Sequence, residues 1–146
     1  MTQFAYVALI QEVEPGGFLV TFPDVPEAIT QGDSWQDAET NAGFALDVAL
    51  EGYLIAGEPW PDAATEVAVQ PKAGEATPRI AVDPGLAARA MLTQAMKAQG
   101  LSKVGLAARL HRDEKTVRRI LSGKAASFDL TLEALRVVGI RPGLFA

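Results

Sequence analysis

The stretch LSKVGLAARLHRDEKTVRRILSG, residues 101–123, has the clearest local pattern in the chain. Apolar residues recur at helical spacing up to Leu110 and again from Val117 onward, and polar residues separate the two runs. Ser102 and Asp113 each precede a run, where a side-chain oxygen can accept hydrogen bonds from the free N–H groups of a first helical turn. Gly123 is typical of a helix end. The stretch therefore predicts two short helices joined by a tight turn.

The second predicted helix carries a basic face. If Val117, Ile120 and Leu121 face inward, the polar residues of the helix face outward together and suit the major groove of DNA. These polar residues are Lys115, Thr116, Arg118 and Arg119. Arg118 and Arg119 are the first candidates for base recognition, because a guanidinium group can pair bidentately with guanine. Lys103 and backbone N–H groups at the start of the first helix, together with Arg112, are expected to hold phosphates. The predicted DNA-binding residues are Ser102, Lys103, Arg112, Lys115, Thr116, Arg118 and Arg119.

A purely structural alternative exists for this basic face, because runs of charge often only keep a surface solvated. Agreement between the turn, the caps and the basic residues favours DNA binding. The spacing resembles the Xre/Cro-like helix-turn-helix family over residues 101–123, with His111 where that family often has Gly. Operators of this type are read by two-fold dimers. The resemblance therefore implies operator DNA as a partner and at least a homodimer.

Charge is divided unequally along the 146-residue chain, whose formal net charge is −5. Residues 1–72 contain one basic and twelve acidic residues, which gives −11, whereas residues 73–146 contain twelve basic and six acidic residues, which gives +6. The C-terminal part suits a polyanion, and the N-terminal part would attract a basic macromolecule. The sequence thus predicts two partners of opposite charge.

The composition excludes several chemistries. The chain has no Cys and only one His, so Cys/His metal clusters and Cys–His nucleophile pairs are excluded. The sequence contains no apolar run of transmembrane length, and its start lacks a signal-peptide pattern. We therefore expect a cytoplasmic protein without a cofactor, a metal or a membrane partner.

The N-terminal half predicts an α+β layer. Alternating apolar residues indicate strands over residues 2–13, 18–22, 28–32 and 65–70. Ser34 can cap a helix that runs to about residue 56. One helix packed on a small antiparallel sheet is the expected fold.

The predicted helix is apolar on more than one side. Its main stripe, expected to pack on the sheet, consists of Trp35, Ala38, Ala42, Ala45, Leu46, Ala49 and Tyr53. Phe44, Val48 and Ile55 lie off that stripe. A helix with more than one apolar side usually contacts something besides its own sheet, and such a contact is expected here.

Residues 71–84 have the composition of a linker, with a possible short strand over residues 80–82. The C-terminal part adds predicted helices over residues 86–99 and 130–138 and an apolar tail over residues 140–145 that suits docking or dimer contact. The sequence thus predicts an acidic domain over residues 1–70, a linker over residues 71–84, and an all-α helix-turn-helix domain for DNA binding and dimerisation over residues 85–146.

A second resemblance rests on the motif GGFLVTFPDVPEAITQGDS, residues 16–34. Together with Asp37-Ala38 and Asn41-Ala42 in the predicted helix and the later Pro59-Trp60-Pro61, the motif resembles the N-terminal domain of HicB-type antitoxins. Glu27 stands where a small residue is expected. The resemblance implies a partial RNase H-like fold that binds and blocks a small, basic, RNA-cleaving HicA-type toxin. It also implies that the C-terminal domain represses the pair's own promoter.

Two alternative functions were weighed against the antitoxin. A metal-dependent ribonuclease needs clustered carboxylates that hold two divalent ions roughly 4 Å apart, and the candidates are Asp24, Glu27, Asp33 and Asp37. Turn and helix-start positions account for Asp24, Asp33 and Asp37, so no catalytic residue is expected. A ligand-responsive repressor needs a pocket with convergent polar groups, and the sequence has no obvious set of them.

Overall fold

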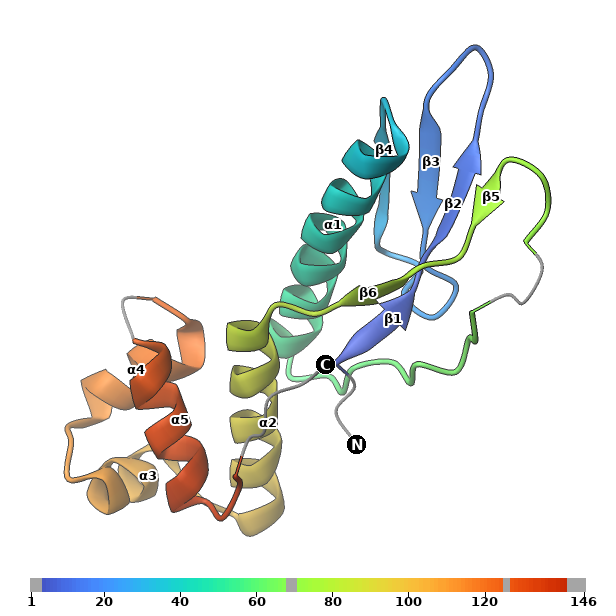
Figure 1. Cartoon of the computed structure of the whole chain (residues 1–146). Helices are drawn as coiled ribbons and strands as arrows, with labels where there is room; N and C mark the ends of the chain where they lie inside the picture. Colours follow the sequence, from blue (N-terminus) through green and yellow to red (C-terminus); the bar gives the residue numbers. More distant parts are fainter. Residues whose placement is uncertain (1–3, 68–70, 125–126, 142–146) are drawn as a thin grey trace. The chain divides into compact units, whose positions relative to one another are not determined.

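The computed structural model describes residues 4–67, 71–124 and 127–141 (Figure 1). The chain divides into two compact units, Met1–Asp83 and Pro84–Ala146, which are called unit 1 and unit 2 below. None of the helices within the described ranges is long and apolar enough to cross a membrane. Each unit buries its own set of apolar side chains.

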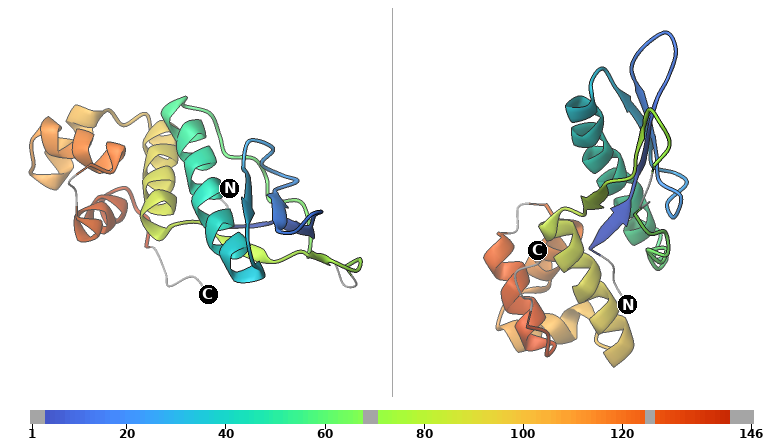
Figure 2. Two further views of the ribbon diagram at one scale, coloured as in Figure 1. Left: turned by 90° about the horizontal axis from the view of Figure 1, so that it is seen from above. Right: turned by 45° about the vertical axis from the view of Figure 1, so that its right-hand side comes forward.

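Unit 1 contains, within the described residues, a four-stranded and a two-stranded antiparallel sheet, with one long helix packed on the larger sheet (Figure 1, Figure 2). Its elements are β1 (Ala5–Val7), β2 (Leu9–Glu12), β3 (Phe18–Thr21), β4 (Ile29–Gly32), α1 (Trp35–Ile55), β5 (Glu75–Ala76) and β6 (Arg79–Ala81). Among the described residues the strands pair in the order β4-β3-β2-β5, while β1 pairs with β6, and every pairing is antiparallel. Helix α1 packs against β4 and β3. The predicted α+β class with a small antiparallel sheet is confirmed.

Helix α1 begins where the sequence predicts, because the Ser34 hydroxyl accepts a hydrogen bond from the Asp37 N–H at 3.0 Å. One row of the helix at four-residue spacing is fully buried, and it consists of Ala38, Ala42, Leu46 and Leu50. Trp35 lies one position off this row and is therefore 42% exposed, with its ring 4.3 Å from that of Phe18. The buried stripe is therefore narrower than predicted.

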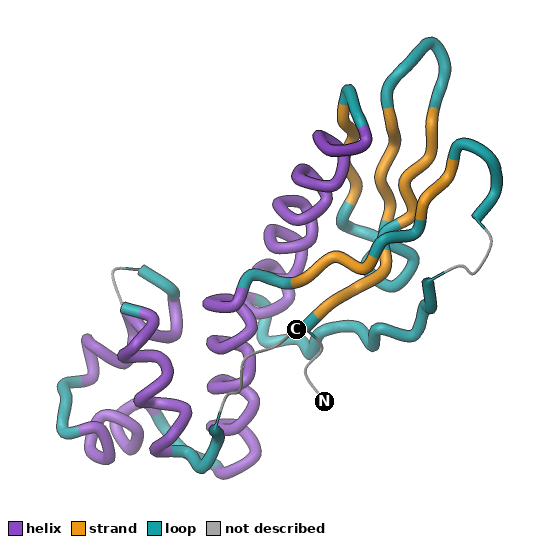
Figure 3. Tube along the Cα trace, in the orientation of Figure 1, coloured by secondary structure: helices purple, strands orange, loops and turns teal. Residues whose placement is uncertain are grey.

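Two predicted strands of unit 1 differ from the structure. The strand expected over residues 2–13 is divided at Ala8, whose N–H donates to the Pro78 carbonyl at 2.9 Å. Residues 65–67 of the fourth predicted strand form a loop (Figure 3), because the Thr65 N–H and hydroxyl both donate to the Asp24 carboxylate, each at 2.9 Å. The rest of that prediction lies outside the described residues.

The segment predicted as a linker, residues 71–84, contains two strands. β5 pairs with β2, and β6 pairs with β1. The segment has the composition of a linker because Pro and Gly lie beside both short strands. The strands nevertheless form, because the backbone N–H and C=O groups at the edges of β1 and β2 need hydrogen-bond partners. Unit 1 therefore extends to Asp83, whose N–H donates to the Asp47 carboxylate at 3.0 Å.

Tyr6 links β1 to the loop that follows α1. Its fully buried side chain donates a hydrogen bond from the hydroxyl to the Pro61 carbonyl at 2.7 Å. Burial, with smaller contributions from the charges of Asp24 and Asp62, raises the pKa of this phenol from 10.0 to about 12. Between pH 10 and about 12 the folded state keeps the Tyr6 hydroxyl proton, whereas the unfolded state has lost it. The free energy of unfolding therefore falls as the pH rises through this range.

We expect the free energy of unfolding to fall by up to about 2 kcal/mol between pH 10 and about 12 through this group. Tyr6→Phe removes the titrating hydroxyl and should make the decline shallower. Urea unfolding at several alkaline pH values, followed by tryptophan fluorescence, measures both proteins. Equal pH slopes for the two proteins would contradict the assignment.

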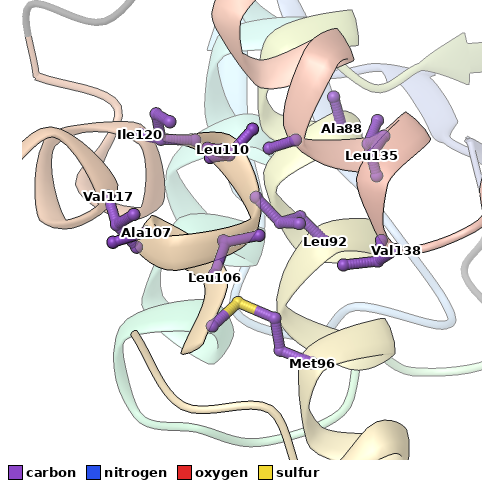
Figure 4. Packing of buried hydrophobic residues seen from close by; sticks show 11 residues of the cluster. Ala88, Leu92, Met96, Leu106, Ala107, Leu110, Val117, Ile120, Leu135 and Val138 are labelled. Atoms are coloured by element: carbon purple, nitrogen blue, oxygen red, sulfur yellow. The ribbon is translucent and has the colours of Figure 1, made fainter. Parts of the chain in front are cut away.

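Unit 2 is a helical bundle of α2 (Pro84–Gln99), α3 (Lys103–Leu110), α4 (Glu114–Ser122) and α5 (Phe128–Val137). Its core includes Leu92 of α2, Leu106 of α3, Ile120 of α4 and Leu135 of α5, all of them fully buried. Figure 4 shows these side chains converging from the four helices. Burial of such side chains is worth about 1.5–3 kcal/mol each before conformational entropy is counted, so the core holds α3 and α4 in place.

The helices of unit 2 lie close to their predicted positions. Helix α2 begins at Pro84, as expected from the tolerance of proline in a first helical turn, and it includes all of the predicted residues 86–99. Helix α5 begins at Phe128 because the Ser127 hydroxyl accepts a hydrogen bond from the Leu130 N–H at 3.2 Å. In the apolar tail predicted over residues 140–145, Ile140 packs against the core of unit 2. Residues 142–145 lie outside the described ranges.

Candidate functional site

Both helices of the predicted DNA-binding segment are capped at their starts. The Ser102 hydroxyl accepts a hydrogen bond from the Gly105 N–H at 3.0 Å. One Asp113 carboxylate oxygen accepts from the Thr116 N–H at 2.8 Å and from the Thr116 hydroxyl at 2.6 Å. These bonds, helped by the charges of Lys115 and Arg119, hold the pKa of Asp113 below its usual value. Both predicted N-caps are confirmed.

The turn between α3 and α4 is made by residues 111–113. His111 ends α3 in the left-handed conformation, with φ 55° and ψ 41°. Non-glycine residues adopt this conformation at a cost of roughly 1–2 kcal/mol. The cost is offset by the Arg112 N–H, which donates to the Ala107 carbonyl at 3.0 Å and closes the end of the helix. The chain can therefore turn sharply here without a glycine.

Helix α4 has one buried side and one basic side. Val117 and Ile120 are fully buried, whereas Lys115, Arg118 and Arg119 are exposed. The C-terminal end of α4 is held by unit 2 itself, because the Arg89 guanidinium donates to the Leu121 carbonyl at 3.3 Å. The basic side chains are thus presented by an anchored helix.

The seven predicted DNA-binding residues all lie in α3, α4 and the residues at their starts, but they are not equivalent. Arg118 forms an ion pair at 2.7 Å with Glu114, one turn earlier on α4. The Thr116 hydroxyl is engaged by Asp113. Lys103 at the start of α3 and Arg112 in the turn are exposed. Arg118 and Thr116 therefore already have polar partners within this segment.

Three of the four candidate carboxylates for a metal site, those of Asp24, Glu27 and Asp37, have structural partners. Asp24 binds Thr65, Glu27 accepts hydrogen bonds from the Tyr53 hydroxyl, and Asp37 accepts from the Asp33 N–H at 2.9 Å. Within the part of the chain that the structure describes, no group of three or more His, Cys, Asp or Glu residues is placed to hold a metal ion.

Unit 1 has a shallow apolar hollow between β4 and α1. The β4–α1 hollow, with a volume of about 430 Å³, is lined by Glu27, Ile29, Thr30, Asn41, Phe44, Ala45, Val48 and Ala49. Ile29, Phe44 and Val48 are 60%, 67% and 74% exposed. The Tyr53 hydroxyl lies 2.7 Å and 2.9 Å from the two carboxylate oxygens of Glu27 and fixes this acidic group at the hollow.

Comparison with known proteins identifies the family. Antitoxin HicB 2 of Photorhabdus laumondii subsp. laumondii is 30% identical to this chain over 129 residues, which are 88% of the chain and 86% of that protein. The chain belongs to the HicB antitoxin family. Antitoxin HicB 1 of the same organism is 45% identical over 56 residues, which are 38% of the chain and 36% of that protein. No family model matches the chain.

Membership of the HicB family confirms the resemblance found in the N-terminal motif. An alignment of 129 residues cannot fit within the residues of unit 1, so the similarity to Antitoxin HicB 2 reaches into unit 2. HicB relatives are named as antitoxins, a regulatory class of protein.

The sequence predicts a contact at the apolar α1 residues of the β4–α1 hollow, but it does not indicate the wall that β4 contributes. Phe44 and Val48 stood out because they lie off the buried stripe of α1. Ile29 alternates with its neighbours as any strand residue does, so nothing local marked it as exposed. The ion pair between Arg118 and Glu114 was also missed, although the spacing of four residues on a helix is a readable signal for it.

Proposed function

We propose that this HicB-family chain is an antitoxin that neutralises a small, basic, RNA-cleaving HicA-type toxin by direct binding through unit 1. Unit 2 represses the promoter of the same operon. The observation that carries the proposal is the separation of charge between two compact units. Unit 1 has fourteen acidic and two basic residues, a net charge of −12, and unit 2 has eleven basic and four acidic residues, a net charge of +7.

A net charge of this size affects which partners a surface meets and how fast it meets them. An acidic surface accelerates encounter with a basic protein and repels nucleic acid, whereas a basic surface attracts nucleic acid and repels a basic protein. A basic RNA-binding toxin and operator DNA are therefore suited to different units of the same chain. In this proposal, the sheet and α1 of unit 1 form a partial RNase H-like fold that blocks the toxin without catalysis, in the cytoplasm.

For the DNA-binding half, the proposal treats α3 and α4 as a helix-turn-helix with α4 as the recognition helix. Lys115, Arg118 and Arg119 on the exposed side of α4 reach base edges, and Lys103 and Arg112 contact phosphates. One such helix covers only a few base pairs, so the chain acts as a dimer on two half-sites about 34 Å apart.

We expect the small reading frame adjacent to this gene to arrest growth when expressed alone, and the full chain to relieve the arrest. The full chain is used because a fragment ending at residue 72 would lack β5 and β6, which complete the sheets of unit 1. Growth curves of cells carrying each gene on an independently controlled promoter make the measurement.

The growth experiment has a matched control in Arg119→Ala, which should relieve the arrest as well as the native chain does. Failure of the native chain to relieve a real arrest would contradict neutralisation. If the product of the adjacent reading frame does not arrest growth, unit 1 has no toxin partner there, and the ligand-responsive repressor is favoured instead.

A further inference from the structure

We propose that the β4–α1 hollow is the surface on which unit 1 receives its basic protein partner. An apolar side chain of the partner fills the hollow, and a Lys or Arg beside it pairs with Glu27. This inference rests on the proposed antitoxin function and adds the place and the chemistry of the contact.

Large apolar side chains are exposed at the β4–α1 hollow in an otherwise strongly charged unit. Phe44 and Val48 lie four residues apart on α1, so they form one continuous ridge, and Ile29 of β4 lines the hollow with them. All three are more than half exposed. Clustered exposed apolar residues beside polar groups mark sites of protein association.

The walls of the hollow are held in a defined shape before any partner arrives. The Asn41 side-chain amide donates to the Gln31 carbonyl at 2.9 Å and ties α1 to the edge strand β4. The buried row on the other side of α1 fixes the same helix against the sheet. A preformed surface loses little conformational entropy on binding, so its apolar contacts contribute more fully to affinity.

The charge of the hollow and of unit 1 as a whole is complementary to that of a basic partner. The Tyr53 hydroxyl fixes the Glu27 carboxylate, and hydrogen bonding to Glu27 raises the pKa of Tyr53. A carboxylate has about four acceptor positions, so Glu27 can still accept a hydrogen bond from a cationic side chain. Two copies of unit 1, each with a charge of −12, would repel one another. A basic partner therefore fits this surface better than a second copy of the chain.

The test is binding of the purified adjacent-gene protein to the full chain, measured by titration calorimetry. We expect Phe44→Glu and Val48→Asp each to weaken binding at least tenfold. Val13→Asp is the matched control, because Val13 is a partly exposed apolar residue of unit 1 outside the hollow, and it should change the affinity less than twofold. Val48→Lys should weaken binding more than Val48→Asp, because a lysine also repels a basic partner.

Each result of the titrations has a distinct meaning. Full binding by the native chain and by both hollow variants would overturn the placement of the contact and leave neutralisation standing. Absence of binding by the native chain would overturn the proposed function and this inference with it. A change in the sedimentation mass of the hollow variants, with unchanged toxin affinity, would assign the hollow to self-association instead. Thermal unfolding of every variant verifies that unit 1 remains folded.

Discussion

Gly32→Ala is expected to destabilise unit 1 by about 3 kcal/mol or more, because overpacking against fixed backbone is strongly unfavourable. Gly32 ends β4 and is buried against the first turn of α1. A Cβ atom at this position would lie 2.7 Å from the Ala38 Cα and 2.9 Å from the Asp37 carbonyl carbon. Neither atom can move easily, because the Ser34 cap and the buried Ala38 hold the helix start in place.

Chemical denaturation followed by tryptophan fluorescence measures this effect in unit 1 alone, since both tryptophans, Trp35 and Trp60, belong to that unit. Gly43→Ala is the matched control. Gly43 lies within α1, and an added Cβ would meet nothing within 4 Å. Its replacement by Ala should stabilise the helix by roughly 0.5–1 kcal/mol. A loss of less than 1 kcal/mol in Gly32→Ala would contradict the close packing of β4 on α1.

Arg119→Ala is expected to lower affinity for the chain's own promoter DNA about 100-fold, since each lost base contact costs about 1–3 kcal/mol and a dimer loses two. Arg118→Ala should have a smaller effect, because Arg118 is already paired with Glu114 and must leave that partner to reach a base. Fluorescence anisotropy with a labelled promoter fragment at one fixed salt concentration measures both variants.

The control for the DNA experiment is Arg136→Ala, which removes the same charge from the exposed surface of α5. It should weaken DNA binding only through the general loss of positive charge. Equal affinities for Arg119→Ala and Arg136→Ala would show that α4 does not read the operator. Relief of growth arrest by all three arginine variants would separate the roles of the two units.

Predictions from sequence succeeded where the deciding contacts are local. Ser34, Ser102 and Asp113 each cap a helix through a backbone N–H three residues ahead, so residue type and spacing were sufficient to predict them. The exposed side of α4 was predicted in the same way, because the burial of Val117 and Ile120 determines which side of the helix faces solvent.

Contacts between distant residues could not be predicted in this way. Asp24 holds Thr65, which lies 41 residues later, and this contact accompanies a loop where residue type favoured a strand. The strands β5 and β6 looked like a linker until β2 and β1 supplied partners more than sixty residues away in the chain. Pairing of this kind depends on which edges remain open after the rest of the sheet has formed.

Residue type and spacing along the chain are sufficient to predict the helices, their caps, the basic side of α4, the division of charge and the family motif. The strand order, the extension of unit 1 to Asp83 and the β4–α1 hollow depend on tertiary contacts. The two groups differ in the range of the interactions that produce them. A helix forms its hydrogen bonds between residues three or four positions apart, whereas a sheet edge or a hollow exists only when distant segments meet.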